Sequence, residues 1–212
     1  MLRKILNFLQ TLRTPVNHRG IWRKTKAQSL VEFAITLPIV LLLLSGVVEF
    51  GFALNYYLSV LDASRQAARW GSNLDPFNTN GTDNYTFYSN VAAEARYNLD
   101  PRVVNPSYEG RRIVLDPAID DVVVTVFSVN GTTVTRYPTA GSYRLYGNVT
   151  PIFNATTIAN NLVTGAPNAG VLVVEVHHNY HQVLKLPWIT PFVPDPMYLR
   201  AYSIMPLSAA EP

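Results

Sequence analysis

The apolar run from Leu30 to Val48 is the feature that most restricts how this chain can fold. It contains a single charged residue, Glu32, and its apolar character continues to Leu54. At about 1.5 Å per residue, a helix from Leu30 to Leu54 is roughly 37 Å long, whereas the hydrocarbon layer of a bilayer is about 30 Å thick. The sequence therefore predicts one membrane-spanning helix at about residues 30–54.

Charges before this run predict its orientation. Residues 1–26 contain seven Lys or Arg and no acidic residue, although the net charge of the 212-residue chain is only +3. Positive flanks are retained on the cytoplasmic side of a membrane. We therefore expect residues 1–27 to form a basic cytoplasmic leader and the carboxy-terminal part to be extracytoplasmic. A basic arm that binds nucleic acid is the alternative, but no aromatic-rich basic surface follows, so no nucleic-acid partner is predicted.

A cleaved secretory signal is a second alternative, because it also places basic residues before an apolar run. Here the run is longer than a usual signal core and continues into a helical pattern, and no small-x-small cleavage site follows it. The sequence therefore favours a retained anchor. It contains no cysteine, which excludes disulfide bonds and thiolate metal sites.

The predicted helix is longer than the span. Ser29 and Glu32 have the S-x-x-E spacing of a capping box, which places a helix start near Ser29. Apolar residues recur at helical spacing beyond the span as far as Gly71, a natural helix stop. We expect one helix over residues 28–71, kinked at Pro38 because proline removes a backbone donor.

Residues 72–212 are enough for one compact extracytoplasmic domain. A second helix is predicted at residues 85–99, and a Pro-rich connection at Pro187–Pro196. The expected strands are Arg111–Leu115, Val122–Val129, Val171–Leu184 and Tyr198–Met205, with a short one at Tyr143–Tyr146 and a hairpin at Asn130-Gly131. This order predicts an α+β fold in which the long amino-terminal helix packs on a carboxy-terminal antiparallel β-sheet with one short extra helix.

Glu32 is the most informative single residue. A carboxylate inside an apolar helix costs a few kcal/mol unless it is paired or lies near the interface. One interpretation is a helix-capping acid at the membrane surface. The other follows from counting: a cut between Ala27 and Gln28 would make Glu32 the fifth residue of the mature chain and create a new amino group at Gln28.

The sequence AQSLVEF followed by AITLPIVLLLLSGVVEFG resembles the amino terminus of TadE-like pseudopilins, minor pilin-like proteins of the tight-adherence (Flp-type) pilus machinery. In that family a prepilin peptidase cuts on the cytoplasmic side, usually after Gly, and leaves Glu as fifth residue, followed by an aromatic residue. Glu32 and Phe33 match this pattern, whereas Ala27 stands where Gly is usual. Further shared positions are Pro38, Gly46, Glu49 and Gly51.

The resemblance implies a role in type IV (Flp) pilus biogenesis and tight adherence, or in a related secretion system. Ala27 and Gln28 would form the processing site, and Glu32 would pair with the amino terminus of a neighbouring subunit. The helix-packing residues it implies are Phe33, Pro38, Gly46 and Gly51. The implied partners are the membrane, prepilin peptidase, other pilin or pseudopilin subunits and the pilus assembly platform.

Such a protein would be a single-pass protein of the cell membrane with a cytoplasmic amino terminus, and it could enter a surface filament. It would not be an enzyme. The alternative is an unprocessed single-pass anchor carrying a binding ectodomain. Glu49 is interpreted as an acid that reaches the outer membrane interface.

A metal site is a weaker hypothesis. Glu175, His177, Asn179 and His181 alternate along one expected strand and share a face, while His178 points the other way. Two imidazoles and a carboxylate can hold a metal, which makes Glu175, His177 and His181 weak candidates for a surface metal-dependent enzyme. An exposed polar strand face explains the pattern equally well. No phosphate loop or G-x-S-x-G motif is present, and no cofactor or catalytic residue is predicted.

Overall fold

The computed structural model describes residues 19–163, 165 and 167–212, with side chains from Ala27 onward. The chain divides after Val47 into two compact units. Most of the predicted basic leader, residues 1–18, lies outside the described residues.

Helix α2 (Arg19–Gly71) is 53 residues long and continues through Pro38. Its end at Gly71 is the predicted one, but its start lies before Ser29, so the predicted capping box at Ser29 and Glu32 is wrong. The cause is local: the residues just before Ser29 include Arg, Lys, Ala and Gln, which favour helix, so the backbone is already helical where a cap would need it to be extended.

The amino-terminal half of α2 exposes its apolar side chains. Ala27–Gly71 is long and apolar enough to cross a membrane, and none of its most apolar stretch is buried. Leu30, Phe33 and Leu43 are each more than 60% exposed. Soluble surfaces rarely expose so large a continuous apolar area, which indicates that this helix is a membrane anchor.

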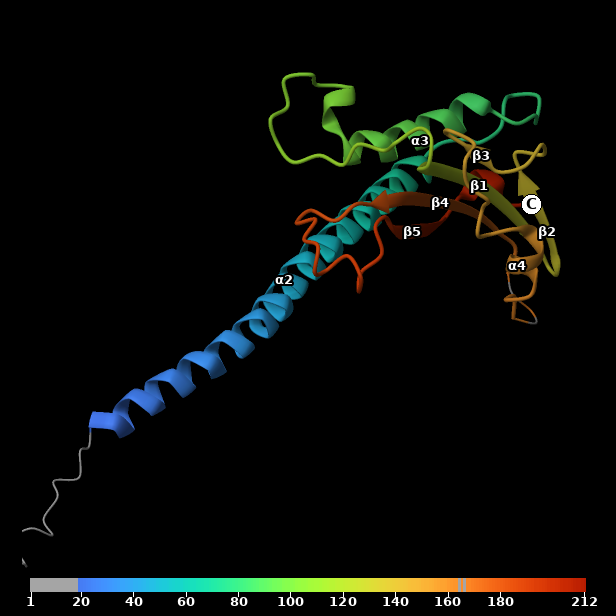
Figure 1. Cartoon of the computed structure of the whole chain (residues 1–212). Helices are drawn as coiled ribbons and strands as arrows, with labels where there is room; N and C mark the ends of the chain where they lie inside the picture. The colour runs from blue at the N-terminus through green and yellow to red at the C-terminus, as the bar shows by residue number, and fades with distance from the viewer. Residues whose placement is uncertain (1–18, 164, 166) are drawn as a thin grey trace, which may run out of the picture. The chain divides into compact units, whose positions relative to one another are not determined.

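The second unit, Val48–Pro212, contains an antiparallel sheet with strand order β2-β1-β4-β5 (Figure 1). Its strands are β1 (Asp121–Asn130), β2 (Thr133–Tyr137), β3 (Tyr143–Arg144, paired with β1), β4 (Ala169–Tyr180) and β5 (Met197–Pro206). Its other helices are α3 (Tyr85–Leu99), the short α4 (Ala155–Ala159) and two 3₁₀ turns at Pro101–Val103 and Ser208–Ala210. The predicted α+β fold is confirmed.

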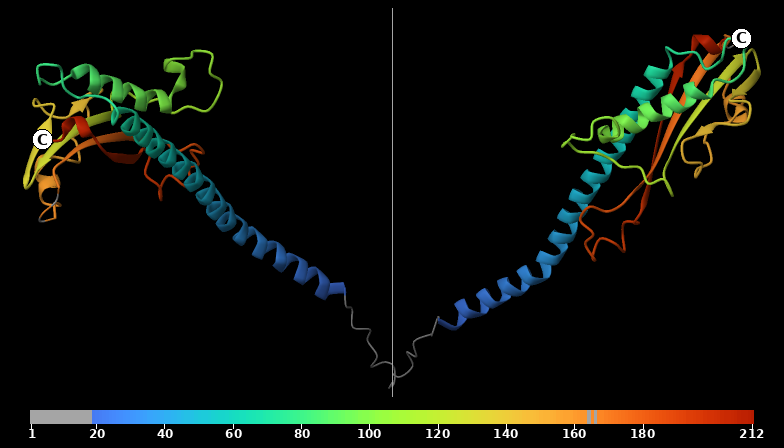
Figure 2. Two further views of the ribbon diagram at one scale, coloured as in Figure 1. Left: turned by 180° about the vertical axis from the view of Figure 1, so that it is seen from behind. Right: turned by 90° about the horizontal axis from the view of Figure 1, so that it is seen from above.

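Within this unit, α3 and the carboxy-terminal part of α2 cover one face of the sheet (Figures 1 and 2). Alternate residues of a strand point to the same face, and in β1 and β4 the even-numbered residues face the helices. The core contains Val122, Val124 and Val126 from β1, Leu172, Val174 and Val176 from β4, Val60, Ala63 and Ala67 from α2, and Val91, Ala92 and Ala95 from α3.

Helix α3 has the predicted bounds because residues next to each of its ends determine where it begins and stops. The Asn84 side chain caps its start by accepting a hydrogen bond from the Phe87 N–H at 3.3 Å. Pro101, which cannot continue a helix, follows Asp100 at its end. The Asn130-Gly131 hairpin is also confirmed: Asn130 pairs with Thr133, and Gly131 has a φ of 62°, which glycine adopts without strain.

The predicted strand Arg111–Leu115 is wrong. Ile113 and Leu115 are buried and the residues between and beside them are not, so the strand-like alternation is real. However, the Ile113 N–H donates to the Leu99 carbonyl at the end of α3, at 2.8 Å. The segment covers the core without a neighbouring strand, and apolar alternation alone could not reveal this.

Candidate functional site

The predicted processing and assembly segment lies on the exposed surface of α2. Glu32 is exposed, and its Oε1 accepts a hydrogen bond from the Gln28 side-chain amide at 3.0 Å. Residues four apart lie one turn apart on the same helix face. The Glu32 carboxylate and the backbone nitrogen of Gln28 therefore belong to one patch of the helix, surrounded by exposed apolar side chains.

The predicted helix-packing residues also lie on helix surface. Phe33 is 63% exposed. A Cβ added at Gly46 or at Gly51 would meet no atom within 4 Å, so both glycines leave open space where another helix could approach closely. Packing at these positions and at Pro38 stays a prediction.

Glu49 contradicts its sequence-based interpretation. Its side chain is only 2% exposed, so it does not reach the membrane interface as a free acid. Its Oε1 accepts hydrogen bonds from the Tyr180 hydroxyl and from the Val183 N–H at 2.9 Å, and its Oε2 accepts one from the Leu184 N–H at 2.9 Å. Three donors from the far end of the chain thus satisfy a carboxylate on the apolar helix.

This carboxylate also explains why β4 is shorter than predicted. The expected strand Val171–Leu184 ends at Tyr180, which pairs with Met197 of β5. The next backbone N–H groups, those of Val183 and Leu184, donate to Glu49 instead of to a neighbouring strand.

The Tyr180 side chain is enclosed by protein. Tyr56 packs edge-on against Tyr180 with ring centroids 4.9 Å apart. Burial, together with the bond to Glu49, raises the pKa of the Tyr180 hydroxyl far above its usual range.

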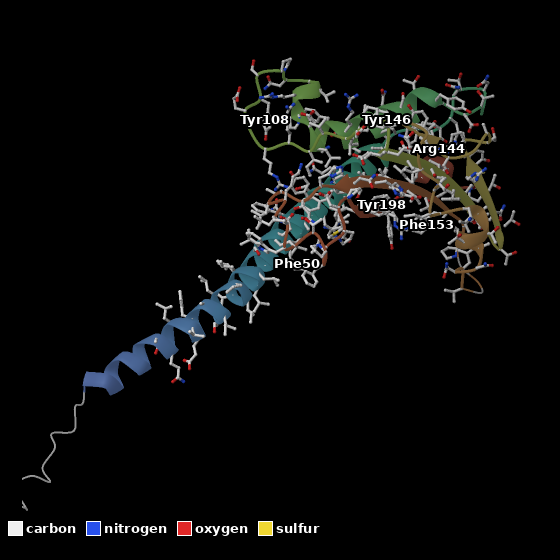
Figure 3. All side chains as sticks on the ribbon, viewed as in Figure 1. Phe50, Tyr108, Arg144, Tyr146, Phe153 and Tyr198 are labelled. Carbon is white, nitrogen blue, oxygen red and sulfur yellow. The ribbon has the colours of Figure 1, made fainter. Side chains whose placement is uncertain are left out.

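The polar face of β4 is buried, so the exposed-face explanation for its pattern is wrong. Glu175 and His177 are at most 1% exposed. The Glu175 carboxylate accepts hydrogen bonds from the backbone N–H groups of Ile152 and Phe153, at 2.9 and 3.3 Å. His177 contacts Glu175 through Nε2 at 3.1 Å and the Tyr198 hydroxyl through Nδ1. Phe153 and Tyr198 lie on this side of the sheet (Figure 3).

His181 does not join Glu175 and His177. It lies beyond the end of β4, and its Nδ1 is 2.8 Å from Asp195 Oδ1. Among the residues that the structure describes, no group of three or more His, Asp or Glu side chains is placed to hold a metal ion. The three weak metal candidates therefore form two separate pairs of hydrogen-bonded side chains.

His178 points to the other face, as predicted, and meets Tyr56 of α2 and the carboxylate of Asp120. His178 Nδ1 lies 2.9 Å from Asp120 Oδ2, and the Asn179 N–H donates to Asp120 Oδ1 at 2.8 Å. Burial opposes ionisation of Asp120. The hydrogen bonds from His178, from the Asp116 N–H and from Asn179 outweigh it, and the pKa of the Asp120 carboxyl lies below its usual value.

Residues 27–69 match the model of one protein family, described as TadE-like protein. The match begins at Ala27 and covers the segment on which the resemblance rests, which confirms that resemblance over this part of the chain. No curated protein and no solved structure matches the chain.

We predict that Glu49→Ala destabilises the domain at Val48–Pro212 by about 2–4 kcal/mol, because buried donors left without an acceptor cost about 1–3 kcal/mol each. Tyr180→Phe is the matched control: it removes one donor and leaves both backbone donors bonded to Glu49, so about 0.5–1.5 kcal/mol is expected. Denaturant unfolding of the full chain in detergent measures both. A smaller effect for Glu49→Ala than for Tyr180→Phe would contradict this role.

Asp120 gives a pH-dependent prediction. Its folded pKa lies below the unfolded value of about 3.9, so its ionised form stabilises the fold above that pH, and the contribution is lost as the pH falls through the folded pKa. The stability difference between the unmodified chain and Asp120→Asn should therefore be largest near neutral pH and shrink below about pH 4. Thermal unfolding between pH 7 and pH 3 measures it; a difference that grows on acidification would show the opposite sign.

Proposed function

We propose that this protein is a membrane-anchored, non-enzymatic pseudopilin-like subunit that takes part in assembly of the Tad pilus or is incorporated into it. One observation carries the proposal: an exposed apolar helix with a carboxylate near the start of its apolar run, inside the segment that matches the TadE-like family. A membrane anchor alone needs the apolar helix but has no need for Glu32.

The exposed apolar surface of the helix must be shielded from water. Lipid shields it while the subunit is in the membrane, and the helices of neighbouring subunits shield it in a filament. Open space at Gly46 and Gly51 allows the backbones of such helices to approach closely. The same surface can therefore serve both the membrane-bound and the assembled subunit.

Glu32 supplies the specific contact. A cut after Ala27 gives the chain a positively charged amino group at Gln28, one helical turn from the Glu32 carboxylate. In a bundle of helices, the carboxylate of one subunit and the amino group of the next neutralise each other in a medium of low dielectric constant. Prepilin peptidase makes the cut, and other pilin-like subunits and the assembly platform are the partners.

The basic residues before the span orient the anchor. They keep the amino terminus in the cytoplasm, where the peptidase acts, and place the domain after α2 outside the membrane. The domain is then presented on the cell surface side of each subunit.

An uncleaved anchor with a binding ectodomain is the second candidate. It is favoured by Ala27, which replaces the usual Gly, and by α2, which runs through the Ala27–Gln28 bond without a break. The two candidates differ in the amino terminus of the mature chain.

We predict that protein isolated from cells with an active prepilin peptidase begins at Gln28. Intact mass and amino-terminal sequencing measure this, and cells lacking the peptidase are the control. Ala27→Gly should be cut at least as completely as the unmodified chain, while Ala27→Lys should remain full length because a long charged side chain replaces a small one beside the cut. A chain that retains residues 1–27 in peptidase-active cells would favour the uncleaved anchor.

We predict that Glu32→Ala leaves membrane insertion and cleavage intact but lowers incorporation or pilus output at least about tenfold, since a buried ion pair that loses one partner costs about 3–5 kcal/mol. Thr36→Val, one turn further along the helix, is the matched control and should assemble normally. Immunoblots of membrane and sheared-pilus fractions measure both. Equal piliation by the Glu32→Ala and Thr36→Val variants would contradict the pairing role.

A further inference from the structure

The loop between β4 and β5, residues 181–196, is fixed against α2. Two of its backbone N–H groups, those of Val183 and Leu184, donate to the Glu49 carboxylate, both at 2.9 Å. Figures 1 and 2 show this loop beside α2, beyond the end of the sheet. The contacts set the position of the loop along the helix: it lies level with Glu49.

Large apolar side chains are exposed at this level. Phe192 is 74% exposed and Trp188 is 46% exposed, although both are aromatic residues in a connecting loop. On α2, the residue after Glu49 is Phe50, which is 68% exposed and projects from the helix (Figure 3). Exposed apolar side chains are therefore present both on the loop and on α2 just after Glu49.

The position of Glu49 along the chain indicates what covers this surface. From Leu30, about 20 helical residues cross a 30 Å hydrocarbon layer, which brings the chain to about Phe50. With this crossing, a loop held level with Glu49 would be at the outer boundary of the bilayer. Trp and other aromatic side chains are enriched at this boundary, and Lys side chains such as that of Lys185 can extend from it into the headgroup region.

The hydrogen bonding of the loop backbone is compatible with a position at the bilayer boundary. Unsatisfied N–H and C=O groups are costly near lipid, and this loop satisfies many of its own. The bonds are Gln182 Nε2 to the Val193 carbonyl at 2.8 Å, Ile189 N–H to Leu186 at 2.9 Å, Phe192 N–H to Ile189 at 2.8 Å and Val193 N–H to Ile189 at 3.1 Å, besides the two to Glu49.

We propose that the loop at residues 181–196 is a second membrane contact, which rests on the outer leaflet with Trp188 and Phe192 inserted between the lipid headgroups and the start of the acyl chains. This inference rests on the membrane crossing in the proposed function. The partner is the lipid surface itself. The loop and the helix together hold the domain to the bilayer at two points.

The absence of cysteine allows a direct test with single-cysteine variants of the full chain. Phe192→Cys carries a spin label on the loop, and Leu43→Cys carries one within the span. Val104→Cys is the matched control: Val104 is apolar and 69% exposed, but it lines a groove with Trp70, which lies about 31 Å further along α2 than Glu49. Each labelled chain is placed in vesicles of phosphatidylcholine and phosphatidylglycerol. Accessibility to oxygen, which concentrates in lipid, and to a water-soluble nickel chelate is then measured.

We expect lipid-like accessibility at residues 43 and 192 and water-like accessibility at residue 104. Trp188→Ser in the Phe192→Cys background should raise nickel accessibility at residue 192 several-fold, because it removes the neighbouring aromatic contact with lipid. Water-like behaviour at residue 192 with lipid-like behaviour at residue 43 would overturn the loop contact and leave the membrane crossing standing. Water-like behaviour at both would overturn the crossing as well. Access of neither reagent to residue 192 would mean that protein covers the loop, which also overturns the proposal.

Discussion

The buried carboxylate of Glu49 is the interaction on which the arrangement of the domain at Val48–Pro212 depends. It lies on an apolar helix, where an unpaired charge costs a few kcal/mol, and the hydroxyl of Tyr180 and two backbone N–H groups compensate it. Tyr180 is the last residue of β4, which lies between β1 and β5 in the sheet, and the two backbone donors follow it in the chain. One side chain thus fixes the sheet to the helix and determines where β4 stops.

Two other buried carboxylates, on the strands of the sheet, also accept hydrogen bonds from distant backbone N–H groups. The carboxylate of Asp121 accepts hydrogen bonds from the backbone N–H groups of Val122, Tyr146, Asn148 and Val149, and Glu175 accepts those of Ile152 and Phe153. Buried acids therefore hold the long, irregular connection between β2 and β4 against one side of the sheet. This chain has no disulfide bonds, and these carboxylates join segments that are distant in sequence.

Sequence patterns predicted those elements whose signals are local. Helix α3 has a capping Asn84 and a following Pro101, and the turn at Gly131 needs a residue that tolerates positive φ, so both could be recognised from a few neighbouring letters. The roles of Glu49 and Glu175 could not, because their donors lie 131 and 23 residues away. An acid in an apolar segment indicated only that a partner was needed. The role assigned to Ala27 and Glu32 depends on other proteins, so the fold of one chain leaves it a prediction.

The distance in sequence between Glu49 and its donors also sets the order in which this contact can form. Residues 180–184 are made more than 130 residues after Glu49, so nearly the whole domain must be synthesised before the carboxylate meets its partners. Until then the Glu49 carboxylate has only water to satisfy its charge. Closure of the last β-hairpin then withdraws this water. A chain whose final hairpin has not formed therefore still carries a hydrated charge on the surface of α2, whereas in the finished chain protein donors surround that charge.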